Sequence, residues 1–149
     1  MSTGEPKIVS FDSESVEYVH RTWPADAREL AVIRHAVRGW LETLSLDSEE
    51  TADLVLAVDE AASNAIEHAY RPGERDVVEL LLWTEPGVLY VEVVDHGRWK
   101  RPSSAASFRG RGIQVMRSIT DSVLIHYDER GTRVLLCRAL PFRRPKPAN

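Results

Sequence analysis

Three polar side chains that could do chemistry recur at four-residue steps in one stretch of the chain. Glu60, Asn64 and His68 interrupt an otherwise mostly apolar segment, Leu54 to Tyr70. Four residues advance an α-helix by slightly more than one turn, so these side chains would form a single polar ribbon. Asparagine is a poor helix former, because its side chain competes for backbone hydrogen bonds. Its presence here indicates that the side-chain carbonyl binds something. A polar stripe that only faces solvent is the simpler alternative.

The segment that carries this ribbon has the pattern of a helix packed against a core. Asp47 and Glu50 stand before it with the spacing of a capping box, and Arg71-Pro72-Gly73 would end it. Its apolar side chains repeat at three- and four-residue steps and share one face, and they are Leu54, Val58, Ala61, Ala62, Ala65, Ile66 and Ala69. The ribbon therefore lies beside the buried face of the predicted helix.

A carboxylate and a glycine follow the second of two β-rich segments. Residues Val77 to Thr84 and Val88 to Asp95 are separated by Glu85-Pro86-Gly87, which predicts a hairpin. A carboxylate where a strand ends can accept a hydrogen bond from the amino group of adenine. Gly97 would let the backbone approach a flat ring closely. An ordinary strand-ending turn has the same composition, so this pattern alone does not decide.

Glycines and arginines alternate before a short predicted helix that ends near Ile119. The run is Arg109-Gly110-Arg111-Gly112-Ile113. Free backbone N–H groups and the positive end of the dipole make a helix start suitable for phosphate, and glycines let the chain wrap closely around it. An arginine can hold a phosphate with two hydrogen bonds. A flexible Gly/Arg linker is the alternative.

The order of predicted elements indicates an α+β two-layer sandwich. Its sheet would be mixed but mainly antiparallel, with the helices on one face. The remaining predicted elements are a strand over Val16 to Arg21 that stops at Trp23-Pro24, an amphipathic helix over Ala25 to Leu44, and two strands over Ser122 to Tyr127 and Thr132 to Ala139.

Together these motifs resemble those of the GHKL (Bergerat-fold) ATPases, which include gyrase B, MutL and the catalytic domains of histidine kinases. The helix ribbon, Asp95-x-Gly97, the Gly110–Gly112 turn and Gly131-Thr132 follow the family's order on the expected elements. The resemblance covers residues 14 to 140, with an N-terminal arm or edge strand at 1–13 and a polar tail at 141–149. Trp99 replaces the second glycine of the first glycine box, a form similar to that in bacterial anti-sigma kinases.

The resemblance implies a binding site for ATP and Mg²⁺. In this family the helix asparagine binds Mg²⁺ and the preceding glutamate is the general base, which correspond to Asn64 and Glu60. The implied nucleotide-binding residues are Asn64, His68, Asp95, Gly97, Arg109, Gly110, Arg111, Gly112, Ile113 and Thr132. Among these, Asp95 would select adenine, and the Thr132 hydroxyl would support Asp95.

Within this superfamily the segment Asp59 to His68 looks most like that of anti-sigma-factor serine kinases, which are bacterial switch proteins. This resemblance implies a protein that binds a sigma factor and phosphorylates a serine or threonine of a STAS-domain anti-anti-sigma partner, commonly as a homodimer. A non-catalytic nucleotide-binding module that sequesters a protein is the alternative, favoured by Trp99 and opposed by Glu60. A histidine-kinase catalytic domain, or a domain cut from a larger phosphatase–kinase regulator, is a further alternative.

Composition limits the class of protein. A chain of 149 residues can form one domain with one core. Its charge of −4, with 23 acidic and 19 basic residues intermixed, gives no general attraction to nucleic acid. Without a long apolar run or a secretory pattern, we expect no membrane span and a cytoplasmic location. The single cysteine, Cys137, predicts a buried idle thiol. His20, His35, His96 and His126 are dispersed in the sequence, which predicts structural roles and no zinc site.

Overall fold

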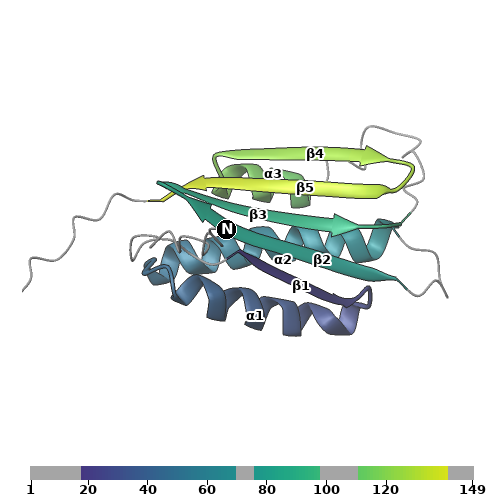
Figure 1. The fold of residues 1–149 in the computed structure, drawn as a ribbon, viewed down its shortest axis with the longest axis horizontal. Coiled ribbons are helices and arrows are strands. Elements are labelled where there is room, and N and C mark those ends of the chain that lie inside the picture. The colour runs from purple at the N-terminus through teal and green to yellow at the C-terminus, as the bar shows by residue number, and fades with distance from the viewer. Residues whose placement is uncertain (1–17, 70–75, 98–110, 141–149) are drawn as a thin grey trace, which may run out of the picture.

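A computed structural model describes residues 18–69, 76–97 and 111–140, which form one sheet and one layer of helices (Figure 1). In chain order the elements are β1 (Val19–Pro24), a one-turn 3₁₀ helix (Ala27–Glu29), α1 (Leu30–Glu42), α2 (Ser48–Ala69), β2 (Val77–Glu85), β3 (Val88–Asp95), α3 (Arg111–Ile119), β4 (Ser122–Asp128) and β5 (Gly131–Ala139). The predicted α+β two-layer fold is confirmed. The predicted arm, tail and helix-stop residues lie outside the described ranges, so those boundaries stay predictions.

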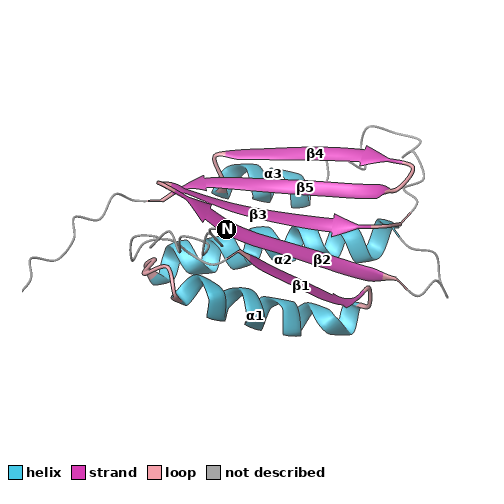
Figure 2. Cartoon of the chain, viewed as in Figure 1, coloured by secondary structure: helices cyan, strands magenta, loops and turns pink. Residues whose placement is uncertain are grey.

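The strands form a single sheet in the order β1-β2-β3-β5-β4, and every described pair is antiparallel. In the view of Figure 2, α2 and α3 lie behind this sheet and α1 runs along its β1 edge, and the described residues place no helix on the other face. Strands β3 and β5 are antiparallel neighbours, so the end of β3 lies beside the start of β5. Asp95 is the register partner of Thr132. This pairing puts both side chains on the helix-covered side.

The core lies between the sheet and the apolar faces of α1 and α2. Ile33, Val37 and Leu41 of α1 are at most 2% exposed, which confirms the stripe predicted for that helix. Four small side chains of α2 are buried in this core, and they are Ala57, Ala61, Ala62 and Ala65. Small residues let a helix approach a sheet closely, so the polar ribbon of α2 is carried near the strand ends.

Asp47 fixes the start of α2. The backbone N–H of Glu50 donates a hydrogen bond to Asp47 Oδ1 at 2.7 Å, which confirms the predicted N-cap. The helix before it is shorter than predicted, since Asp26 caps a 3₁₀ turn first and α1 ends at Glu42. The described helices include none that is both long and apolar enough to cross a membrane.

Cys137 corrects one prediction, because its thiol is only partly buried. In the strand register it pairs with Tyr90 and Ser122, on the sheet face that no described helix covers. Trp83 stacks on Tyr90 on that same face, with ring centroids 5.2 Å apart. The strand β5 was predicted correctly from its alternating apolar residues. Alternation does not show which face of the strand the helices cover, so the burial of Cys137 was predicted wrongly.

Candidate functional site

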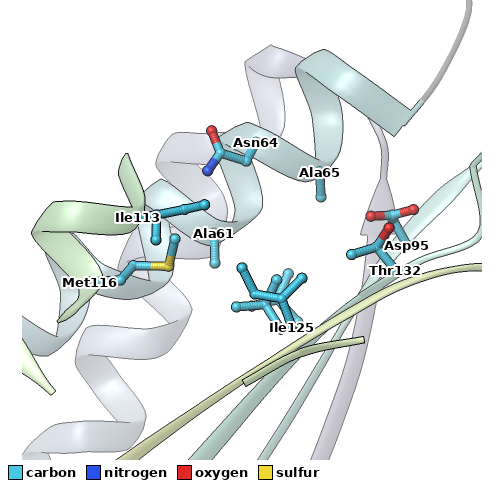
Figure 3. Close-up of a pocket in the computed structure, with 10 residues that line it drawn as sticks. Ala61, Asn64, Ala65, Asp95, Ile113, Met116, Ile125 and Thr132 are labelled. Atoms are coloured by element: carbon cyan, nitrogen blue, oxygen red, sulfur yellow. The ribbon is translucent and has the colours of Figure 1, made fainter. Parts of the chain in front are cut away.

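A small pocket lies between α2, α3 and the sheet (Figure 3). It is lined by Ala61, Asn64, Ala65, Val93, Asp95, Ile113, Met116, Ile125, Thr132 and Val134. Most of its wall is apolar, with polar groups at two places. Asp95 and Thr132 stand together on the sheet, whereas Asn64 comes from α2 (Figure 3). An apolar slot with a few convergent polar groups is the usual form of a small-molecule site.

The two polar groups on the sheet are buried and face the pocket. Asp95 is 3% exposed, and its Oδ1 accepts a hydrogen bond from the Gly97 N–H at 3.1 Å. The Thr132 hydroxyl is also buried, and it finds no hydrogen-bond partner within the described part of the chain. A buried hydroxyl without a partner is costly, so its position on a pocket wall indicates a place for a ligand or water hydrogen bond.

The helix ribbon meets the start of α3 at Gly112. A Cβ atom on Gly112 would lie 3.0 Å from Asn64 Nδ2 and 3.0 Å from Glu60 Oε2. Both distances are tighter than most real Cβ contacts, so a side chain here would force the Asn64 and Glu60 side chains to shift. Two segments far apart in the sequence therefore meet beside the pocket, which Asn64 and Ile113 line, although their roles in binding stay predictions.

The structure tests the position of only some of the predicted site residues. Ile113 lines the pocket, and Gly97 is buried beside Asp95. Arg109, Gly110 and Trp99 lie outside the described residues. His68 falls on α2 and Arg111 on α3, but their side chains are not described.

Several pocket residues were not predicted as part of the site. Met116 of α3, Ile125 of β4 and Val134 of β5 form much of the apolar wall (Figure 3). They follow the periodicity of their helix and strands, so the sequence predicts that they are buried but not what they enclose. Only the register of β4 on β5, with Ile125 opposite Val134, brings these two together.

We expect Gly112→Ala to reduce a reaction at this site more than it changes stability. The new methyl group would push the Asn64 and Glu60 side chains aside by a few tenths of an ångström. If these side chains have the predicted roles, their displacement should lower the rate by about tenfold. Gly39→Ala on α1 is the matched control, because nothing lies within 4 Å of the place its new methyl group would take. It should raise the free energy of unfolding by about 0.5–1 kcal/mol and leave the rate unchanged. Phosphotransfer rates and urea unfolding would compare the two.

A helix layer on an antiparallel sheet, with a polar-ended pocket between them, is the form of a nucleotide-binding domain of the ATPase type. Residues 23–138 match the family model of the histidine kinase-like ATPase domain, and the chain belongs to this family. This match and the relatives described next confirm the resemblance to the GHKL anti-sigma kinases.

Two named relatives indicate the branch of the family that this chain resembles. An anti-sigma F factor of Clostridium botulinum (strain Eklund 17B) is 30% identical over 118 residues, which cover 70% of this chain and 81% of that protein. A serine-protein kinase RsbW of Bacillus velezensis is 29% identical over 85 residues, or 57% of this chain and 53% of the relative. This chain thus spans about half of that kinase's length.

A solved structure shares the fold. The crystal structure of the RsbU and RsbW domains of a Mycobacterium tuberculosis protein superposes with a TM-score of 0.64 at 24% sequence identity. The match covers 83% of this chain and 32% of that one, so this chain spans about a third of the solved protein.

Proposed function

We propose that this chain is an ATP-dependent serine/threonine protein kinase that acts as an anti-sigma factor. It would phosphorylate a STAS-domain anti-anti-sigma partner and sequester a sigma factor. The close approach of Gly112 to Asn64 and Glu60 carries the proposal, because it brings a candidate base and a candidate metal ligand to a helix start, beside the pocket that Asn64 lines. Family membership and relatives named anti-sigma F factor and serine-protein kinase support it.

The chemistry of the pocket lining supports an adenine nucleotide as the ligand. The buried Asp95 carboxylate can accept a hydrogen bond from the exocyclic amino group of adenine, and the Thr132 hydroxyl offers a second polar contact beside it. The apolar wall suits a flat ring. Gly112 and the backbone N–H groups at the start of α3 are suited to the phosphates, because a side chain at this position would crowd the cleft.

The donor atoms present also fit Mg²⁺. A hard cation takes oxygen ligands, and few of them need to come from the protein when ATP phosphates complete the shell. The Asn64 amide oxygen would hold the ion, which when bound would neutralise phosphate charge. Glu60 lies one helical turn before Asn64 and faces the same glycine, so its carboxylate is suited to accept the proton of the attacking hydroxyl group.

Radiolabelled ATP and the cognate STAS-domain protein would test this function. The wild-type chain should transfer the γ-phosphoryl group, and Glu60→Gln should lower the rate by about a hundredfold or more while ATP still binds. Glu67→Gln is the control, since Glu67 is an exposed glutamate of the same helix.

ATP binding without transfer by the wild-type chain would favour the non-catalytic regulator instead. A chain that binds neither ATP nor a sigma factor would contradict both functions. The homodimer and the cytoplasmic location stay predictions, and light scattering would test the first of them.

A further inference from the structure

One carboxylate joins two histidines that are far apart in the sequence. Glu79 of β2 contacts His20 of β1 through Oε1 at 2.9 Å from Nε2, and it contacts His96 through Oε2 at 2.5 Å from Nε2. The histidines are dispersed in the sequence, but in the fold this pair converges on Glu79. The Glu79 side chain is 21% exposed, whereas the two histidine side chains are 48% and 44% exposed.

This cluster lies on the sheet face that no described helix covers. Glu79 stands between Val78 and Leu80, which are fully buried on the helix side, so its own side chain points the other way. Partial burial would raise the pKa of Glu79, but the hydrogen bonds from His96 and His20 outweigh it and hold the pKa below its ordinary value. The carboxylate is therefore a charged acceptor for both rings, which strengthens each bond.

His96 connects the cluster to the nucleotide pocket through the backbone. It directly follows Asp95, whose side chain points to the opposite side of the sheet and into the pocket. It also precedes Gly97, whose N–H holds the Asp95 carboxylate at 3.1 Å. The position of the His96 ring therefore bears on the peptide groups on both sides of it, including the one that orients Asp95.

The segment Asp95 to Gly97 also lies against β5. A Cβ on Gly131 would lie 2.9 Å from the His96 Cα atom, so the backbone after Asp95 runs directly against β5. Glu79 contacts the segment through the His96 ring, while Gly131 contacts its backbone. Between them they fix where the chain leaves β3.

We propose that Glu79 and His96 are positioning residues for nucleotide binding, which orient the adenine-binding carboxylate of Asp95 from the opposite face of the sheet. This inference rests on the proposed function. The two residues act through the backbone and touch neither ATP nor the transferred group, so they should affect nucleotide affinity and not the rate at saturating ATP. Their effects should also not add, because both act through one hydrogen bond.

The test measures the Kd for ATP by calorimetry and the kcat of phosphotransfer in the full chain. Glu79→Ala and His96→Ala should each weaken ATP binding by about fivefold, which is less than the roughly tenfold or more expected for a charged hydrogen bond lost directly from a ligand, because the effect reaches Asp95 only through the backbone. The kcat should stay within about twofold of wild type. The double variant should be no weaker than either single one by more than about twofold. His96→Gln should restore most of the affinity, because its amide nitrogen can donate from a similar position.

Glu92→Ala is the matched control. Glu92 is a partly buried carboxylate on the same face, paired with Arg133 at 2.6 Å, but this ion pair runs to β5 and does not involve His96. Its substitution should leave the Kd for ATP within about twofold of wild type. Equal weakening by Glu92→Ala, or unchanged affinity in His96→Ala, would overturn the inference alone. Failure of the wild-type chain to bind ATP would overturn the proposed function together with it.

Discussion

Asn64→Ala is expected to abolish phosphotransfer to the STAS-domain partner. Its amide is the proposed protein ligand for Mg²⁺, and losing several kcal/mol of charge stabilisation in the transition state corresponds to about a thousandfold or more in rate. The fold should survive, because Asn64 is partly exposed on α2 and alanine is a better helix former by about 0.5 kcal/mol. The measurement is transfer from radiolabelled ATP, with the far-UV spectrum and urea midpoint recorded for the same samples.

Two further variants separate the metal role from general damage to the helix. Asn64→Asp keeps an oxygen ligand and should retain more activity than Asn64→Ala. Ser63→Ala changes the neighbouring residue, whose hydroxyl contacts Glu67 at 3.4 Å, and should leave the rate unchanged. Undiminished transfer by Asn64→Ala would exclude the proposed metal ligand.

Gly131→Ala should give the largest loss of stability among the substitutions considered. Gly131 has φ +140°, and a Cβ there would lie 1.9 Å from the Asp95 carbonyl oxygen and 2.8 Å from its carbonyl carbon. The obstacle is backbone inside the β3–β5 ladder, so no side-chain rotation relieves it. Strain and overpacking together should cost about 3–5 kcal/mol or prevent folding. Urea unfolding followed by circular dichroism measures this loss.

Gly87→Ala is the control for backbone conformation alone. Gly87 lies in the β2–β3 turn at φ +77°, with nothing within 4 Å of the position that a methyl group would occupy. Its substitution should cost about 1–2 kcal/mol, the penalty of the left-handed region without a clash. If Gly131→Ala were no more destabilising than Gly87→Ala, the close approach of β5 to Asp95 would be wrong.

Periodicity predicted most of the fold. The three- and four-residue repeat of α2 and the cap at Asp47 gave a helix whose start the structure confirms, and alternation around the Glu85-Pro86-Gly87 turn gave the β2–β3 hairpin. These signals are local, because each depends only on residues within one element or one turn. The end of α1 was predicted less well: the helix ends at Glu42 and not at Leu44. In the turn that follows, Ser45 has a positive φ, which is uncommon for a residue other than glycine.

Contacts between side chains on different strands could not be predicted from patterns in the sequence. Glu79 is a charged residue within a mostly apolar strand, and nothing in the neighbouring sequence relates it to His20 or His96. Both contacts depend on the pairing of β2 with its two neighbours, which the structure supplies. The position of Gly112 against Asn64 was implied only by the resemblance, because no pattern within either helix indicates that α2 and α3 meet there.

A crystal structure of the chain with a non-hydrolysable ATP analogue and Mg²⁺ would test the central claim most directly. We predict adenine against Asp95 and Thr132, the metal ion on the Asn64 amide oxygen, and phosphates beside Gly112 at the start of α3. A nucleotide bound elsewhere, or one in this pocket with its phosphates directed away from Asn64 and Gly112, would contradict the assignment.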